Sequence, residues 1–322
     1  MFFFSCDWGT SSFRLRLVRR ANGAVEGELR SEEGVARLAR DQAPGKRAKA
    51  FERALDAHVR ELSRRHGLQP GDIPVVVSGM ASSSVGWREL PYAQVPFPVD
   101  GSGAVTAPVP FSTGRPPATL VSGLRTETEV MRGEEAQLIG LFSLPAWKGF
   151  AGDSLVLLPG THSKHVVVRD GALTGFRTFM TGELFEVLAT QSMLRHSVEY
   201  SPREGVRVCN AAFEAGVASA KDRPLSQALF QVRTNTLLGR FAPRENFWFF
   251  SGLLMGVESF DVARRGGDSP VVLCSPLAGV YERAFRQAGL GPRLKVVAPD
   301  EVEKLSVRGH AVILQRQQGA KP

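Results

Sequence analysis

The stretch Cys6-Asp7-Trp8-Gly9-Thr10-Ser11-Ser12-Phe13-Arg14-Leu15-Arg16-Leu17-Val18 decides the fold of this chain. Apolar residues precede Asp7, so the segment has the pattern of a strand, a tight turn of glycine and hydroxyl residues, and a second strand. In the second strand Phe13, Leu15 and Leu17 alternate with arginines, which is the period of a half-buried strand. We therefore predict a β-hairpin here, with Gly9, Thr10 and Ser11 in its turn.

The composition of this turn suits phosphate binding. Backbone N–H groups of a turn rich in glycine and serine can converge on phosphate oxygens. Asp7 ends the first strand, and its carboxylate can hold an accompanying Mg²⁺ ion through water. An ordinary hairpin with a polar tip has the same pattern, so the hypothesis depends on matching segments further along the chain.

A second segment repeats the pattern. Residues 155–158 predict a strand, Pro159-Gly160-Thr161-His162-Ser163-Lys164 a turn, and residues 165–169 another strand. Two such hairpins can hold one polyphosphate from opposite sides. The repeat predicts a duplicated architecture with one phosphate-binding turn in each half.

Length and composition predict an ordinary globular protein of two lobes. The chain has 322 residues, 43% of them hydrophobic and 22% charged, and no apolar run reaches the length of a membrane span. The net charge of +8 is not clustered and is not interleaved with aromatic residues, so we expect no nucleic-acid partner and no membrane partner. The three cysteines fit no metal or disulfide spacing, which favours a cytoplasmic location. A homo-oligomer is compatible with this composition, but no pattern specifies one.

The order of predicted elements places the domain boundary at residues 143/144. Antiparallel strands, a helix over 48–62 and a buried strand over 73–77 make an N-terminal lobe of residues 1–143. Residues 144–153 contain Pro145, Gly149 and Gly152 and predict a hinge, after which residues 144–322 form the C-terminal lobe. Its last helix is expected to pack back toward the hinge.

Two further segments carry less regular patterns. Residues 100–118 are rich in Pro, Gly, Ser and Thr, and we predict a long loop. In Met131–Gly140, Glu134 and Glu135 occupy the predicted first turn of a short helix, where the helix dipole favours negative charge. That electrostatic role alone accounts for both carboxylates.

Taken together, these segments resemble the actin-like ATPase superfamily. Its sugar kinases have an Asp-x-Gly-Thr first hairpin, a helix start of the Gly-Asp-Gln-Gln type and a Gly-Thr hairpin soon afterwards. Within the superfamily, the chain is most similar to the 2-dehydro-3-deoxygalactonokinase family. The segments that carry this resemblance, spread over residues 6 to about 285, are the first hairpin, Gly79-Met80, Gly86-Trp87, Met131–Gly140, Gly160–Lys164, Phe179–Leu184 and Ser251–Glu258.

The resemblance implies an α/β fold of the two-lobed actin-like ATPase (ribonuclease H-like) type. Each lobe would be a mixed sheet flanked by helices, with the active-site cleft between the lobes. The implied reaction is transfer of a phosphoryl group from ATP, with Mg²⁺, to the terminal hydroxyl of 2-dehydro-3-deoxy-D-galactonate. The product would be the 6-phosphate, formed in galactonate catabolism.

The resemblance also assigns residues to ATP and to proton transfer. Glu134 corresponds to the general base that accepts the proton of the substrate hydroxyl. The related kinases usually have Asp at that position, so Glu135 stays open as the alternative. His165 stands where an aromatic residue is expected, and the double glycine common near the adenine is missing. The residues implied to bind Mg²⁺, the phosphates or the adenosine are Asp7 for the metal and Gly9, Thr10, Ser11, Gly160, Thr161, Lys164, Gly252 and Ser275 for the nucleotide.

A sugar acid needs a cation for its carboxylate, and a guanidinium group binds a carboxylate through two hydrogen bonds. Arg14, Arg132 and Arg177 are the candidates, because each adjoins one of the matching segments. The residues after the strand at 73–78 are also candidates, since open α/β sheets bind ligands at the C-terminal ends of their strands. These residues are Ser82, Ser83 and Trp87.

Three other functions fit parts of the sequence. Exopolyphosphatases of the same superfamily have a Glu-Glu-Ala helix start, but their second hairpin has a Gly-Gly-Gly-Ser turn, unlike Gly160–Ser163. A sugar sensor without activity is expected to have lost Asp7 or the carboxylate at 134, and both are present. A kinase for a different sugar acid stays open, because no pattern distinguishes epimers.

Overall fold

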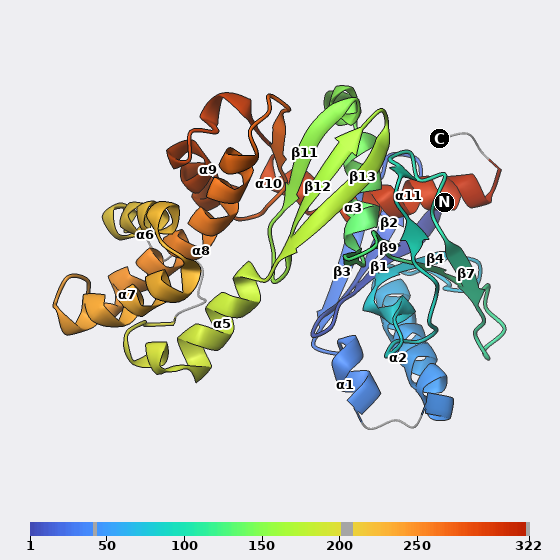
Figure 1. Cartoon of the computed structure of the whole chain (residues 1–322). Coiled ribbons are helices and arrows are strands. Elements are labelled where there is room, and N and C mark those ends of the chain that lie inside the picture. Colours follow the sequence, from blue (N-terminus) through green and yellow to red (C-terminus); the bar gives the residue numbers. More distant parts are fainter. Residues whose placement is uncertain (41–43, 201–208, 320–322) are drawn as a thin grey trace. The chain divides into compact units, whose positions relative to one another are not determined.

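The computed structural model describes residues 1–40, 44–200 and 209–319, and the chain divides into two compact units (Figure 1). Unit 1 consists of Met1–Gly152, Val168–Gly175 and Glu303–Pro322, and unit 2 of Asp153–Val167 and Phe176–Val302. The domain boundary at residues 143/144 stays a prediction. Within residues 144–153, which we expected to be a hinge, Pro145–Lys148 form helix α4 and Gly149–Ala151 a 3₁₀ turn, both in unit 1, and Asp153 begins unit 2.

The sheet of unit 1 has the strand order β3-β2-β1-β4-β8-β7. Strands β1 (Phe2–Trp8), β2 (Phe13–Arg19) and β3 (Val25–Ser31) are antiparallel neighbours. On the other side of β1, β4 (Val75–Gly79) and β8 (Ala118–Val121) continue the sheet in parallel. The predicted N-terminal hairpin, the third strand and the buried strand are therefore confirmed.

The two faces of this sheet differ in polarity because side chains alternate along each strand. One face packs its apolar side chains, such as Trp8 and Leu15, against Phe51 and Leu55 of helix α2 (Pro44–Arg65). The opposite face carries Ser5 and Asp7 of β1, together with Arg14 and Arg16 of β2. Helix α11 (Leu305–Gln317) reaches this polar face, where Ser5 Oγ and His310 Nδ1 are hydrogen-bonded at 2.8 Å.

Helix α11 also packs on α3 (Glu134–Phe142) through glycine positions. A Cβ atom at Gly140 would lie 2.0 Å from the carbonyl oxygen of Leu305, and one at Gly309 would lie 1.9 Å from that of Ala136. Only glycine permits so close an approach of the two backbones. In place of the single last helix that the sequence predicts, the structure has two helices, α10 (Pro299–Val302) and α11.

The second sheet has the order β15-β14-β11-β12-β13-β6. Its strands are β11 (Asp153–Leu158), β12 (Ser163–Arg169), β13 (Ala172–Phe179), β14 (Val271–Leu273), β15 (Leu294–Val296) and the short β6 (Phe97–Pro98). When the edge strands β7 and β6 are set aside, both sheets have the order third, second, first, fourth, fifth. This repetition confirms the predicted duplicated architecture.

The rest of unit 2 is helical. A Cβ atom at Gly252 of α8 would lie 2.1 Å from the carbonyl oxygen of Phe213 in α6, so these two helices are in close backbone contact. Phe213, Phe250 and Leu253 fill the core around them. The helices are α5 (Thr181–Gln191), α6 (Asn210–Asp222), α7 (Leu225–Leu237), α8 (Pro243–Arg265) and α9 (Ala278–Gln287).

The prediction of a long loop over residues 100–118 is partly wrong, because this segment contains strand β7 (Thr106–Val109). Pro108 lacks an N–H group, but β7 is an edge strand and tolerates that loss. The sequence analysis also missed helix α1 (Val35–Arg40) and a small sheet of β5 (Ala93–Gln94), β9 (Leu124–Arg125) and β10 (Val130–Met131).

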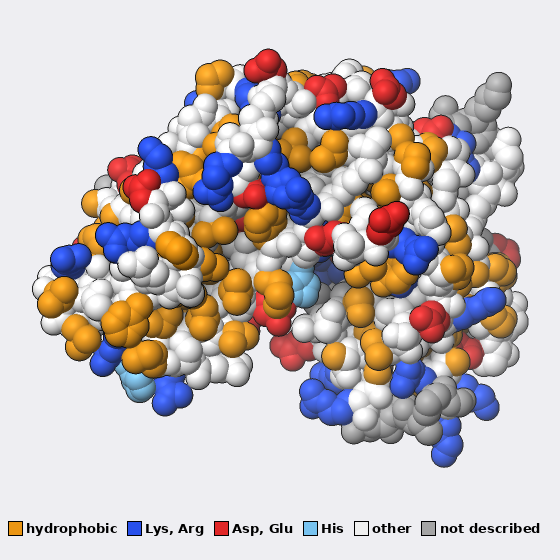
Figure 2. Space-filling model, in the orientation of Figure 1, with side chains coloured by type: hydrophobic (Ala, Val, Ile, Leu, Met, Phe, Trp, Pro, Cys, Tyr) orange, Lys and Arg blue, Asp and Glu red, His pale blue; other side chains and the backbone are white. Residues whose placement is uncertain are grey.

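None of the helices formed by the described residues has the length and apolar character needed to cross a membrane. On the face shown in Figure 2, Lys and Arg side chains are spread among Asp and Glu side chains.

Candidate active site

Asp7 lies near the end of β1, opposite Arg14 of β2 and Ser78 of β4 in the strand register. Burial has the largest effect on its carboxyl and raises the pKa; Arg14 and Arg16 lower the pKa, and Glu134 raises it. A Cβ atom at Gly79 would lie 2.6 Å from the carbonyl oxygen of Trp8 and 3.4 Å from Asp7 Oδ1. Glycine therefore leaves room beside this carboxylate at the end of β4.

The turn after β1 is held by backbone contacts and exposes its side chains. The N–H of Gly9 donates to the carbonyl of Ser12 at 2.9 Å, and the N–H of Ala36 in α1 donates to the carbonyl of Thr10 at 3.0 Å. Thr10 and Ser11 are exposed. The structure therefore fixes the backbone of the predicted phosphate turn while its hydroxyl groups stay accessible.

The start of α3 lies beside the same strand end. A Cβ atom at Gly133 would lie 3.5 Å from the Cα of Gly79. Glu134 Oε2 accepts a hydrogen bond from the N–H of Arg132 at 3.0 Å, and its charge influences the pKa of Asp7. The two predicted carboxylates, Asp7 and Glu134, are therefore brought together.

Glu135, the alternative base, is placed differently. Its side chain is buried, and Oε2 accepts a hydrogen bond from the N–H of Gly133 at 2.7 Å. Burial, and next the charge of Glu134, raise the pKa of Glu135 to about 8. Glu135 is therefore a buried carboxyl of the helix start, whereas Glu134 is partly exposed.

Four of the predicted sugar-acid residues have structural partners. Arg132 Nη1 donates to the carbonyl and the hydroxyl of Ser82 at 2.6 and 2.7 Å, and its guanidinium lies 4.3 Å from the centre of the Tyr92 ring. Ser83 Oγ donates to the carbonyl of Met80 at 2.8 Å. Trp87 is 8% exposed and belongs to the apolar core with Trp8 and Phe111. Their role as ligands of the sugar acid stays a prediction, and in the structure each of them makes contacts within the fold.

Arg14 is the sugar-acid candidate whose side-chain N–H donors are unused among the described residues. Neither a hydrogen bond nor an ion pair joins its side chain to any residue that the structure describes. Burial lowers the pKa of its guanidinium, and the like charges of Arg16 and Arg30 act in the same direction. By contrast, Arg177 in unit 2 has a side chain 58% exposed and lies 4.0 Å from Asp261.

The second turn, in unit 2, adjoins the N-terminus of α5. Gly160 and Thr161 are exposed, and the N–H of Glu183 donates to the carbonyl of Thr161 at 3.2 Å. A Cβ atom at Gly182 would lie 2.7 Å from the Cα of Thr161. A helix N-terminus favours anions, so this contact strengthens the prediction of a phosphate turn. The sequence analysis assigned no role to Gly182 or Glu183, although both lie in one of the matching segments.

Lys164 is buried, and its ammonium is hydrogen-bonded to the backbone of the second turn. Lys164 lies in β12, which begins at Ser163 and not at residue 165 as predicted, and its Nζ donates to the carbonyl of His162 in the turn at 2.9 Å. A lysine in this position supports the backbone of the turn. Direct contact between Lys164 and a phosphate group stays a prediction.

Neither of the predicted adenine residues faces open space. Gly252 contacts α6, and Ser275 is 1% exposed, with its hydroxyl accepting from the N–H of Leu277 at 3.0 Å. Helix α9 begins at Ala278, so Ser275 caps the turn before it. Close packing of α8 on α6 is enough to explain a glycine at position 252. The assignments of Gly252 and Ser275 to adenosine therefore have no geometric support.

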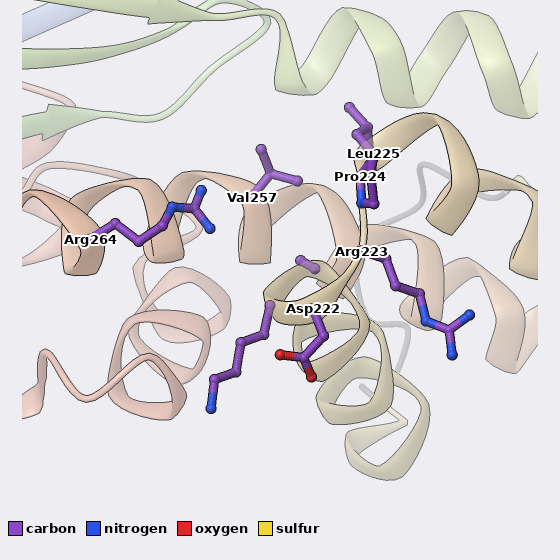
Figure 3. Close-up of a pocket in the computed structure, with 8 residues that line it drawn as sticks. Asp222, Arg223, Pro224, Leu225, Val257 and Arg264 are labelled. Atoms are coloured by element: carbon purple, nitrogen blue, oxygen red, sulfur yellow. The ribbon is translucent and has the colours of Figure 1, made fainter.

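A pocket of about 360 Å³ lies where the α6–α7 junction meets α8 (Figure 3). Val257 and Arg264 of α8 line it, together with Asp222 and Leu225 from the junction, and the Arg223 side chain extends away from Val257. Gly252 and Ser275 are absent from its described lining. The pocket therefore gives no support to the predicted adenine site.

The donor set near Asp7 suits Mg²⁺. Within the described part of the chain, no group of three or more His, Cys, Asp and Glu residues is arranged to hold a metal ion. A Mg²⁺ ion in a phosphoryl-transfer enzyme keeps several waters and needs only one or two protein carboxylates besides the substrate phosphates. Asp7, a hard oxygen donor whose charge is incompletely balanced, fits that requirement.

Both sheets have the same strand order once the edge strands β7 and β6 are set aside, and in each sheet a Gly-Thr turn follows the first strand. These two features define the duplicated fold of the actin-like ATPase superfamily. Within it, the chain belongs to the 2-keto-3-deoxy-galactonokinase family, whose model matches residues 7–307. The family predicted from the sequence is confirmed.

Individual relatives agree with this family. The chain is 35% identical over 299 residues to a Rhizobium meliloti (strain 1021) protein assigned as 2-dehydro-3-deoxygalactonokinase DgoK1, covering 91% of each chain. It is 31% identical over 316 residues to the 2-dehydro-3-deoxygalactonokinase of Escherichia coli (strain K12), covering 96% of this chain and 98% of that one. A crystal structure from Sinorhizobium meliloti, assigned as the same enzyme, matches with a TM-score of 0.78 and 32% identity over 97% of this chain and 99% of that chain.

Proposed function

We propose that this protein transfers the γ-phosphoryl group of ATP to the terminal hydroxyl of 2-dehydro-3-deoxy-D-galactonate and forms the 6-phosphate. Kinases of this family use ATP, and membership of the family supports the reaction class. The observation that carries the assignment to residues is the grouping of Asp7, Glu134 and Arg14 beside the first turn. We also propose a role in galactonate catabolism and a cytoplasmic location.

Glu134 is the general base in this proposal. As the oxygen of the sugar hydroxyl forms its bond to the γ-phosphorus, Glu134 accepts the hydroxyl proton. The bond from that phosphorus to the bridging oxygen breaks, and ADP leaves with the electron pair. Partial exposure and the hydrogen bond from the N–H of Arg132 suit Glu134 to this role. Glu135, with a pKa of about 8, is largely protonated at neutral pH and suits it less.

The other residues bind and orient the substrates. Mg²⁺, held by Asp7 through water, would neutralise charge on the phosphate groups. Gly9, Thr10 and Ser11 in unit 1, and Gly160 and Thr161 in unit 2, would donate hydrogen bonds to those groups. Arg14 would bind the carboxylate of the sugar acid through two hydrogen bonds, since its donors are uncommitted among the described residues.

A coupled ADP-release assay with a panel of sugar acids tests this proposal. With Mg-ATP present, 2-dehydro-3-deoxygalactonate should give the highest kcat/KM, above that of its gluconate epimer and of simple aldonates. A higher value for another acid would keep the kinase chemistry and change the substrate. ADP release that needs no sugar acid would favour a phosphohydrolase.

A further inference from the structure

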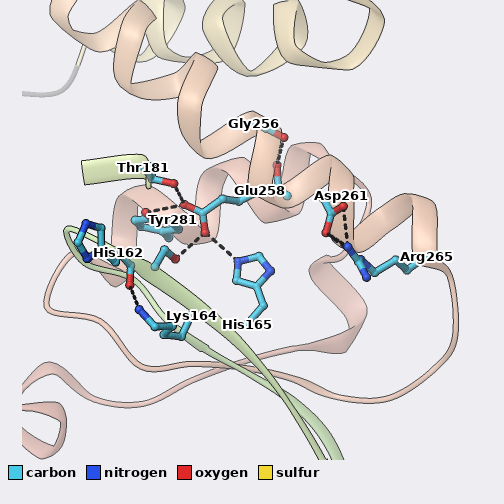
Figure 4. A network of polar contacts seen from close by, with 11 residues as sticks. His162, Lys164, His165, Thr181, Gly256, Glu258, Asp261, Arg265 and Tyr281 are labelled. Atoms are coloured by element: carbon cyan, nitrogen blue, oxygen red, sulfur yellow. Dashed lines mark hydrogen bonds and ion pairs between the residues drawn. The ribbon is translucent and has the colours of Figure 1, made fainter. Parts of the chain in front are cut away.

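Glu258 of α8 is a buried carboxylate that has no part in the reaction described above. It is 1% exposed, yet both of its oxygens accept hydrogen bonds from other side chains (Figure 4). Oε2 accepts from Ser163 Oγ at 2.6 Å and from His165 Nε2 at 2.8 Å. Oε1 accepts from the hydroxyl of Tyr281 at 3.1 Å and from that of Thr181.

These four donors satisfy the carboxylate. An ionised carboxylate accepts only, with about four lone-pair positions on its two oxygens. Burying such a charge is unfavourable unless hydrogen bonds replace its hydration. The donors come from β12, α5 and α9, so one side chain of α8 links three other elements.

Two of the linked elements border the second phosphate turn. Ser163 begins β12 directly after the turn, and Thr181 begins α5. The next two residues of α5 contact the turn itself: Gly182 lies against Thr161, and the N–H of Glu183 donates to the carbonyl of Thr161. The carboxylate thus fixes the strand that leaves the turn and also the helix end that lies against it.

His165 fits the same arrangement. The resemblance leads one to expect an aromatic residue at this position, and the His165 ring does lie against Phe179, with ring centres 4.5 Å apart. In addition, its Nε2 donates to Glu258. His165 therefore combines an aromatic contact with a polar link to Glu258.

From this geometry we infer that Glu258 is a positioning residue, which holds the Gly160–Thr161 turn and the N-terminus of α5 in the arrangement that receives the phosphate groups of ATP. It acts through Ser163 and Thr181 and does not touch the nucleotide. The inference rests on the proposed function only in that the second turn binds the phosphates of ATP.

The test compares Glu258→Gln with Asp261→Asn. Asp261 lies about one turn further along α8 and pairs with Arg265 at 2.7 Å, so it is a matched control outside the network. Calorimetric titration with Mg²⁺ and a non-hydrolysable ATP analogue gives Kd, and steady-state kinetics give KM for each substrate. Hydrogen exchange is followed in peptides that cover the second turn and the start of α5.

For Glu258→Gln we expect Kd for the analogue and KM for ATP to rise roughly 10–100-fold, the effect of losing a hydrogen bond to a buried charge. KM for the sugar acid should not change, and exchange should accelerate in the two segments. Asp261→Asn should match the wild type. A lower Tm with unchanged Kd, or faster exchange across all of unit 2, would overturn the inference.

A second pair of variants tests the inference even if Glu258→Gln fails to fold. Thr181→Val and Tyr281→Phe each remove one donor to the same oxygen, but only Thr181 belongs to the helix end against the turn. Thr181→Val should weaken analogue binding more than Tyr281→Phe does, and equal effects would contradict the inference. Because the titration contains no sugar acid, a wild type that binds the analogue but phosphorylates no acid would refute the proposed function alone.

Discussion

The two Gly-Thr turns follow equivalent strands, yet their surroundings balance charge in opposite ways. Beside the first turn, burial raises the pKa of Asp7, and Arg14 has no ion pair among the described residues. Beside the second turn, Glu258 accepts four hydrogen bonds, and the ammonium of Lys164 is bonded within the turn. The same backbone arrangement thus supports one site with incompletely balanced charges and one whose charges are satisfied.

This difference has a physical meaning. A buried charge without a full set of partners destabilises the fold, and such groups concentrate where a substrate or ion completes them. A fully hydrogen-bonded network makes its surroundings rigid. We interpret the first turn as the place of the chemistry and the second as a rigid support for the nucleotide.

The largest effect that this comparison predicts comes from Glu134→Gln. Loss of a positioned general base should lower kcat roughly 10²–10⁴-fold. The affinity for an ATP analogue should stay near that of the wild type, because the proposed role of Glu134 is proton transfer and not nucleotide binding. Steady-state kinetics and calorimetry measure the two quantities. If Glu135→Gln loses the activity instead, the base is the neighbouring residue.

Asp7→Asn should lower kcat/KM by roughly 10²–10³-fold, in line with the loss of one electrostatic group at a reacting centre. Binding of the ATP analogue should weaken with Mg²⁺ present and remain unchanged without metal. Titrations under the two conditions, with thermal unfolding as a control for the fold, check this. Equal loss under both conditions would assign Asp7 to the fold.

Arg14→Gln should raise KM for the sugar acid roughly 10–100-fold, as expected when a carboxylate loses a charge-assisted hydrogen bond. KM for ATP should change little. Arg177→Gln is the matched control, because Arg177 is an exposed arginine whose side chain lies 4.0 Å from the carboxylate of Asp261. If the control raises KM for the sugar acid instead, the predicted role of Arg177 gains support over that of Arg14.

The smallest effect concerns stability. The pKa of Glu135 rises from an ordinary value of 4.5 to about 8, so between these values the folded state retains a proton that the unfolded state has lost. Its contribution to stability is present below about pH 4.5 and is lost as the pH rises through about 8. Glu135→Gln should therefore gain a few °C in Tm over the wild type at about pH 8.5, and less at about pH 5. A constant difference would contradict the assigned protonation.

Local patterns predicted much of the fold and the first turn. The hairpins repeat within short stretches of sequence, so Asp7, Gly9 and Thr10 could be proposed before the structure, whereas Glu134 was implied by the resemblance to sugar kinases. The role of Gly252 could not be decided from the sequence, because a small residue in a helix serves helix packing and ligand approach equally well. Strand β7 was hidden by Pro108, since prolines are rare in strands except at edges.

The polar networks could not be predicted in the same way. Ser163 and Glu258 are 95 residues apart, and Arg132 and Ser82 are 50 apart. No periodicity relates such pairs, because their contact depends on the tertiary packing of several elements. The sequence does not distinguish Arg14, Arg132 and Arg177, but the structure does. Arg14 is partly buried and has no ion pair with a residue that the structure describes, Arg132 is hydrogen-bonded to Ser82, and Arg177 is exposed.

The most direct measurement is ³¹P nuclear magnetic resonance of the wild-type protein with Mg-ATP and 2-dehydro-3-deoxygalactonate. It distinguishes a phosphate ester of the sugar acid from inorganic phosphate and follows ADP in the same sample. We predict that a phosphomonoester coupled to the terminal carbon appears in step with ADP, and that little inorganic phosphate forms with or without the sugar acid. Inorganic phosphate that appears at the same rate in both samples, with no ester signal, would contradict the assignment of this protein as a sugar-acid kinase.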